Sequence, residues 1–187
     1  MDFDNYIKEL KTINLAKANV VAIGYLVVFA VLFGFLYFLV WGPEFKSYFF
    51  NFKKKVFLFI PLLMFFFGII VHELVHGVFF AKFAEHGWKS VKFGVLWKML
   101  TPYAHCKEPL KIKHYKIAVL APLVLVGLLP ALVGVILGDA ILTIFGILMS
   151  GSAAGDIMIY NIIKKENPED YVQDHPSEAG CWIYRKN

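Results

Sequence analysis

The chain has 187 residues, of which 59% are hydrophobic and only 18% are charged, and its mean hydropathy is +0.63. Soluble domains are typically about 45–50% apolar and about 25% charged, so a water-soluble fold of this size could not bury so much apolar surface. This composition indicates an integral membrane protein. The net charge of +5 does not indicate nucleic-acid binding, because the basic residues flank apolar segments. Two cysteines, Cys106 and Cys181, exclude a disulfide framework and a four-cysteine zinc finger.

Four segments are long and apolar enough to cross a bilayer as helices. They are residues 20–41, 56–81, 117–138 and 140–163. Pro122 and Pro130 are expected to kink the third segment, and the last two form a tight hairpin around Gly138 and Asp139. The chain is predicted to be a single domain, 1–187, with an all-α polytopic membrane fold.

The loop 82–116 is too long for a simple connection. Alternating apolar residues from Val91 to Trp97 have the period of a strand, and Thr101–Cys106 could pair with it. We therefore expect a cytosolic or interfacial β-hairpin between the second and third spans. A short basic helix is expected at 110–116, and a possible strand at 181–184 lies in the tail 164–187.

Lysine and arginine residues predict the orientation of the spans, because they are enriched on the cytosolic side. Fifteen of them lie in residues 1–19, 82–116 and 164–187, against four in residues 42–55. Both termini and the loop 82–116 are therefore predicted to be cytosolic, in a multi-pass protein of the cell membrane.

A polar cluster interrupts the second span. His72-Glu73-Leu74-Val75-His76 has the pattern HExxH, in which two histidines four residues apart on a helix can reach one metal ion. Glu73 is placed to act on a metal-bound water. Ionisable groups at membrane depth cost at least about 2.5–3.5 kcal/mol each and are functional candidates. The alternative is a buried polar patch that joins helices.

A third ligand is needed, because catalytic zinc usually has three protein ligands and water. Asp156 is favoured, since it lies in the last span at a depth between those of His72 and His76. It follows a run of small residues, 150–155, that would let two helices approach closely. Gly77, beside His76, is expected to be the small residue that faces this run from the other helix.

Other residues could complete or support the site. Glu73 is disfavoured as a ligand because it points about 100° around the helix from His72. His105 and Cys106 would have to fold back from the loop to act as ligands, or could lie on the substrate side, where they could stabilise an oxyanion. They could equally be an ordinary strand pair at the membrane interface. Ser152 could hydrogen-bond the carboxylate of Asp156.

Four stretches together resemble a family of small bacterial membrane proteins described as putative zincin peptidases. They are residues 72–77, 102–110, 155–157 and 174–176. More distantly, the layout is similar to that of site-2 proteases, which are intramembrane zinc peptidases whose Asn-Pro and Leu-Asp-Gly signatures are missing here. In those enzymes the HExxH lies on one core helix and an aspartate ligand lies two helices later. This resemblance implies His72, His76 and Asp156 as ligands of Zn²⁺.

These patterns predict a zinc-dependent endopeptidase embedded in the lipid bilayer, acting on a membrane protein or peptide. Metal-activated water would attack the peptide bond, with Glu73 as general base and then as proton donor to the leaving amine. The alternative is a non-catalytic membrane protein that binds or transports a divalent metal. Hydrolysis needs Glu73 as a base, whereas a transporter could use it as a charge or ligand.

Overall fold

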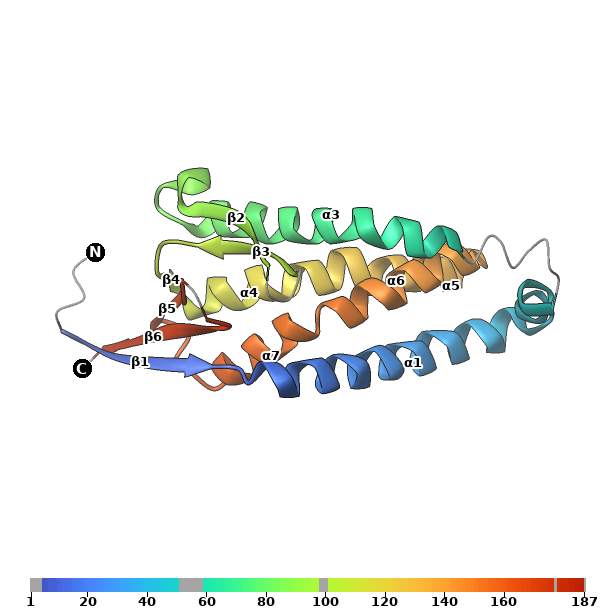
Figure 1. The fold of residues 1–187 in the computed structure, drawn as a ribbon, viewed down its shortest axis with the longest axis horizontal. Helices are drawn as coiled ribbons and strands as arrows, with labels where there is room; N and C mark the ends of the chain where they lie inside the picture. Colours follow the sequence, from blue (N-terminus) through green and yellow to red (C-terminus); the bar gives the residue numbers. More distant parts are fainter. Residues whose placement is uncertain (1–4, 51–58, 98–100, 177, 187) are drawn as a thin grey trace. The chain divides into compact units, whose positions relative to one another are not determined.

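The computed structural model describes residues 5–50, 59–97, 101–176 and 178–186, and Figure 1 shows the order of its elements. Its internal contacts divide the chain into two compact units. The sheet unit comprises Met1–Ala18, Glu73–Ala121 and Gly155–Asn187, and the helical unit comprises Asn19–His72 and Pro122–Ala154. Each helix that passes from one unit to the other therefore contributes to both.

Within the described residues, three helices are long and apolar enough to cross a membrane, or four if a bent pair is counted as one span. α1 (Leu15–Phe50) contains the stretch Asn19–Gly42 and has non-helical backbone angles at Trp41. α3 is Phe59–Phe83, and α4 begins the third span, Ile112–Leu137. These findings are compatible with a multi-pass membrane protein. The first residues of the predicted second span, 56–58, lie outside the described residues.

The third and fourth spans are irregular helices. The third comprises α4 (Ile112–Pro122), the π-helix η3 (Leu123–Leu128) and α5 (Leu129–Leu137). The fourth comprises α6 (Ala140–Ser152) and α7 (Ala154–Ile163), which are bent by 44° relative to one another. Proline and small residues weaken helices at such points. At the two prolines expected to kink the third span, the π-helix begins directly after Pro122, and Pro130 lies in the first turn of α5.

The helical unit is held together by side-chain packing and by hydrogen bonds from α1 to α5 and its C-terminal cap. Tyr37 donates its hydroxyl proton to the carbonyl of Gly138 at 2.7 Å, and Trp41 Nε1 donates to the carbonyl of Val135 at 2.9 Å. Gly138 ends α5 with φ of 72°, and Asp139 then caps α6 by accepting from the backbone N–H of Leu142. The predicted hairpin around Gly138 and Asp139 is therefore present.

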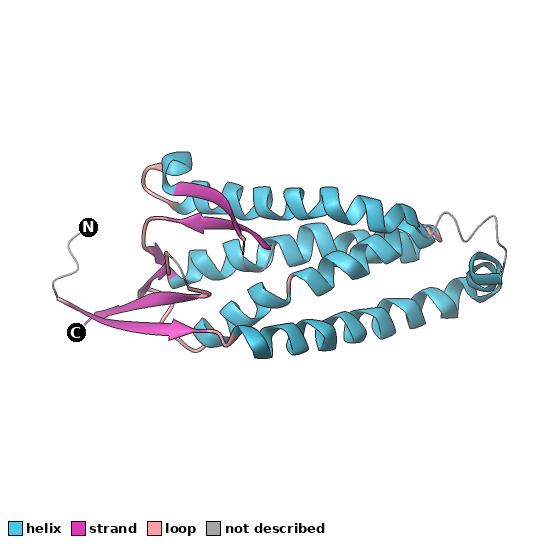
Figure 2. Cartoon of the chain, in the orientation of Figure 1, coloured by secondary structure: helices cyan, strands magenta, loops and turns pink. Residues whose placement is uncertain are grey.

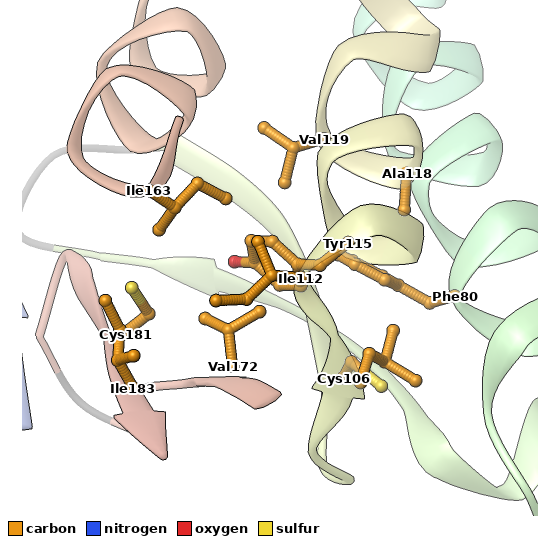
Figure 3. Close-up of a cluster of buried hydrophobic side chains, with 11 residues drawn as sticks. Phe80, Cys106, Ile112, Tyr115, Ala118, Val119, Ile163, Val172, Cys181 and Ile183 are labelled. Atoms are coloured by element: carbon orange, nitrogen blue, oxygen red, sulfur yellow. The ribbon is translucent and has the colours of Figure 1, made fainter. Parts of the chain in front are cut away.

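The sheet unit contains a four-stranded antiparallel sheet of order β1-β6-β5-β4. Its strands come from the N-terminus, the long loop and the C-terminal tail; they are β1 (Tyr6–Thr12), β4 (Leu110–Lys111), β5 (Tyr171–Asp174) and β6 (Gly180–Lys186). Side chains between this sheet and the helices form a buried cluster, of which Ile112, Tyr115, Ile163, Val172 and Ile183 are central members (Figure 3).

The predicted hairpin in the long loop is also present. The 3₁₀ helix η2 (Gly87–Ser90) leads into β2 (Val91–Leu96), which pairs antiparallel with β3 (Thr101–Cys106). Glu108 anchors this hairpin to the end of α3, because its carboxylate accepts from Ser90 Oγ at 2.5 Å, from the backbone N–H of Glu85 at 2.9 Å and from the ring of His86.

Two expectations about the fold are wrong. The chain is not all-α, because it contains a four-stranded sheet in addition to the expected hairpin (Figure 2). The segment 110–116 is not a separate short helix: its first two residues form β4, and α4 begins at Ile112. Leu110 and Lys111 pair with Val172 and Tyr171, so a tertiary contact selects the strand over the local helical preference.

Candidate metal centre

His76 is oriented by a hydrogen bond to α4. Its Nδ1 lies 2.9 Å from the carbonyl oxygen of Ala118. A carbonyl can only accept, so Nδ1 carries the proton and Nε2 carries the lone pair of a neutral ring. The side chain is 7% exposed and stacks on Phe80. His76 is therefore held in the tautomer that presents Nε2 to a metal.

Pro122 explains why the carbonyl of Ala118 can accept this bond. In an α-helix the carbonyl of residue 118 would accept from the backbone nitrogen of residue 122, four positions later. Proline has no N–H to donate. The carbonyl of Ala118 is therefore available to the ring of His76, on a neighbouring helix.

Asp156 faces the other side of the same imidazole. Its Oδ1 lies 3.2 Å from His76 Nε2, and its side chain is 20% exposed. It lies in the first turn of α7, just after the bend, where the positive end of the helix dipole stabilises a carboxylate. A new helix start at this depth thus supplies a favourable position for an acidic side chain.

His72 lies one turn before His76 on the continuous helix α3. Ligand atoms of His72, His76 and Asp156 all lie within 4.8 Å of one another, and both histidines are buried. Two imidazole nitrogens and one carboxylate oxygen form a donor set typical of catalytic zinc sites, so these residues fit that ion. The structure brings together the three residues that the sequence proposes as ligands.

Glu73 is the neighbour of His72 on α3 and is only partly buried. Successive helical residues differ by about 100° around the axis, so Glu73 projects away from the direction of His72. It is outside the group of three close ligand atoms. This position suits a residue that acts beside the metal rather than on it.

A cavity of about 250 Å³ opens in front of His76 and Asp156 within the sheet unit. Tyr103, Ala104 and His105 of β3 line it, as do residues of the β5–β6 connection. The predicted substrate-side residue His105 therefore shares a cavity with two of the candidate ligands. Space for a small group exists beside the candidate metal site.

Asp174 is a cavity residue whose side-chain role sequence reasoning missed. Its carboxylate accepts from the backbone N–H of Cys106 at 2.8 Å and from the hydroxyl of Tyr115, and lies 4.0 Å from His105 Nδ1. Burial raises the pKa of Asp174 above its ordinary value, although the bonds from Tyr115 and Cys106 act in the opposite direction. The signal in the sequence was the stretch 174–176, which served there only as part of the family resemblance.

The side chain of Cys106 lies in the apolar cluster (Figure 3), and Cys106 is not among the residues that line the cavity. Burial raises the pKa of its thiol to about 12. The backbone of Cys106, not its thiol, therefore supports the cavity wall.

The hydroxyl of Ser152 donates to the carbonyl of Met149 at 2.8 Å within its own helix, rather than toward Asp156 as predicted.

The expected close approach at Gly77 has a different partner. A side chain at Gly77 would meet the rings of Phe93 and Trp88, so the glycine makes room for the hairpin. At Gly151 the nearest neighbour is Leu26 of α1, and a side chain at Gly155 would meet open space. Gly77 and the small-residue run therefore do not form the matching pair that we expected.

Comparison with known proteins gives one match. A family model described as "Putative zincin peptidase" matches residues 65–171, which is more than half of the chain and includes most of α3, the hairpin and all of α7. No curated protein and no solved structure matches the chain.

Replacing Asp156 with asparagine should weaken zinc binding while leaving the shape of the site nearly unchanged. Loss of a group outside the ligands typically costs about 10–100-fold in affinity, so we expect a loss above about 100-fold for Asp156→Asn. Competition with a chromophoric chelator measures it. Glu178→Gln, at an exposed residue of the cavity rim, is the charge-matched control and should bind as wild type does. Equal affinity of Asp156→Asn and wild type would remove Asp156 from the ligand set.

Replacing Pro122 with alanine should affect the site through His76. The new backbone N–H would compete for the carbonyl of Ala118, and zinc affinity should fall about tenfold, within the range for a lost orienting bond. Pro130→Ala, in α5 of the same span, is the control. If the two proline variants bind zinc equally well, the orienting role of the Ala118 carbonyl is wrong.

Proposed function

Because the chain belongs to the family described as putative zincin peptidases, we propose that it is a zinc-dependent endopeptidase embedded in the membrane. The observation that carries this proposal is the close grouping of His72, His76 and Asp156, two of which flank Glu73 in the HExxH motif. This donor set, with a glutamate beside it, is suited to hydrolysis.

The residues of the site would divide the chemistry as follows. His72, His76 and Asp156 would hold the ion, and bound zinc supplies Lewis acidity that makes water a nucleophile near neutral pH. Glu73 takes the proton of the attacking water and then gives it to the leaving amine nitrogen. The carbonyl of Ala118 keeps the ring of His76 in its binding tautomer.

The substrate would be an extended segment of a membrane protein or peptide. A helical segment hides its peptide bonds in internal hydrogen bonds, so it must unwind before cleavage. β3 lines the cavity at Tyr103, Ala104 and His105 and pairs with β2 along one edge. Its other edge offers backbone groups to an added strand, with Pro102 limiting the pairing.

The strand pairing in the sheet supports the proposed topology. β1 pairs with β6, and β4 pairs with β5 in the same sheet, so the N-terminus, the long loop and the C-terminal tail lie on one side of any membrane. Each connection between them must then cross an even number of times. We infer four crossings, with α6 and α7 as one bent span, and the excess of lysine and arginine supports a cytosolic location of the sheet.

Replacing Glu73 with glutamine should separate catalysis from metal binding. Glu73→Gln keeps size and polarity but cannot accept a proton, so we expect wild-type zinc content and a loss of cleavage of at least about 100-fold. Zinc is measured by elemental analysis, and cleavage by mass spectrometry on a library of single-span peptides reconstituted with the protein.

Glu85→Gln, at an exposed position beyond the end of α3, is the control and should cleave as wild type does. Cleavage retained by Glu73→Gln would contradict the mechanism. Zinc binding without any cleavage by wild type would instead favour the metal-binding or transport protein.

Cysteine labelling tests the orientation. Cys106 and Cys181 are fully buried, and burial raises the pKa of each thiol to about 12, so the native thiols should stay unlabelled. With a membrane-impermeant maleimide on intact cells, Leu137→Cys beside the α5–α6 turn should react. Lys89→Cys and Lys186→Cys should react only after permeabilisation. The reverse pattern would place the cavity on the external side.

A further inference from the structure

The hairpin β2–β3 exposes a row of apolar side chains. Phe93 is 45% exposed, Val95 is 39% exposed and Trp97, just after β2, is 78% exposed. Side chains alternate between the two faces of a strand, so Phe93 and Val95 lie on one face, and the exposed Trp97 follows directly after the end of β2. The opposite face carries Lys92 and Gly94, which pair with His105 and Tyr103 of β3. One face of the hairpin is therefore apolar, and the other carries Tyr103 and His105, which line the cavity.

The apolar face is attached to a membrane-spanning helix. Phe93 and Trp88 pack where a side chain at Gly77 would be, and Gly77 precedes the end of α3 at Phe83 by six residues. At about 1.5 Å per residue, this contact lies roughly 9 Å inside the end of the span. The hairpin thus lies beside the span rather than beyond it.

The direction of the hairpin carries its apolar residues further along α3. β2 starts after the end of α3, at Val91, and has reached Gly77 by Phe93. Figure 1 shows β2 and β3 beside the C-terminal turns of α3. Each residue of a strand adds about 3.3 Å, so Val95 lies roughly 7 Å beyond Phe93. The strand leads toward the interior of a bilayer that α3 spans.

The surroundings of the hairpin suit lipid on one side and water on the other. Leu74 and Val78 of α3 are 47% and 49% exposed and extend the apolar surface that the hairpin presents. Non-helical backbone at membrane depth is tolerated where it lines a water-filled cavity, and β3 lines the cavity beside His76 and Asp156. Lipid is therefore the partner that matches the apolar face.

We propose that β2–β3 is a re-entrant hairpin that enters the bilayer from the side of the sheet and contacts lipid through Phe93, Val95 and Trp97. Its other face, with Tyr103 and His105, borders the aqueous cavity. The hairpin thereby separates lipid from the water that reaches the candidate metal centre. This inference depends on the geometry of the hairpin and not on the proposed peptidase activity.

Tryptophan fluorescence tests the proposal directly. A variant that retains only Trp97, made by Trp41→Phe, Trp88→Phe and Trp182→Phe, is reconstituted into phosphatidylcholine vesicles with brominated acyl chains. We expect bromine to quench at least half of its emission and aqueous iodide to quench little. A matched variant that retains only Trp182, in β6 beneath Lys8, should show little quenching by the brominated lipid.

The result is decisive in either direction. Strong iodide quenching of Trp97 with weak bromolipid quenching would place the hairpin in water and overturn the proposal.

Trp41 donates a hydrogen bond to Val135, so the triple variant could lose stability. A second pair of variants avoids this change.

Val95→Cys and Lys92→Cys, on opposite faces of β2, each carry a nitroxide label, and their collision rates with oxygen and with a water-soluble nickel chelate are compared. Oxygen concentrates in lipid, so we expect the ratio of oxygen to nickel collisions to be several-fold higher at Val95 than at Lys92. Equal ratios at the two positions would overturn the proposal.

Discussion

The hydrogen bond from His76 to the carbonyl of Ala118 is the contact on which the candidate metal centre depends. It joins the helix that carries HExxH to the helix that follows the long loop, and it sets which ring nitrogen faces Asp156. Its acceptor is available because Pro122 cannot donate to it. The hydrogen bond that is missing from one helix thus leaves a carbonyl that orients a ligand on another helix. An unsatisfied polar group would be costly in these surroundings.

The irregularities of the last two spans likewise supply polar groups to the candidate metal centre. The third span contains Pro122 and a π-helix, and the fourth is bent just before Asp156. A regular apolar helix would satisfy its backbone internally and offer no polar group at membrane depth. Breaks in the helices supply an acceptor carbonyl in one span and a helix N-terminus in the other, and both serve the same small group of side chains.

The four-stranded sheet solves a separate problem, which is to hold three distant segments of the chain together. β1 precedes the first span, β4 precedes the third, and β5 and β6 follow the last. Glu166 strengthens this arrangement, because it accepts from Lys11 of β1 at 2.6 Å and from Arg185 of β6 at 2.9 Å. The bonds from Arg185 and Lys11 lower the pKa of Glu166, so the carboxylate stays charged well below neutral pH. Through Asp174, the same sheet supplies a buried wall of the cavity.

The sequence alone determined the features that depend on local pattern. These are the long apolar helices, the hairpin at 91–106, the turn at Gly138 and Asp139, and the HExxH motif. Asp156 was favoured because charge is rare in apolar segments, and only the structure shows its carboxylate 3.2 Å from His76 Nε2. Apolar length, strand alternation and the rarity of charge in apolar segments are properties of neighbouring residues, so they can be read without a fold. Only the tertiary structure decided that Leu110 begins a strand, that Gly77 receives Phe93, that Asp174 faces the cavity, and that the thiol of Cys106 is buried. Each of these depends on a partner far away in the chain, and a sequence pattern does not encode which distant surface will meet a given residue.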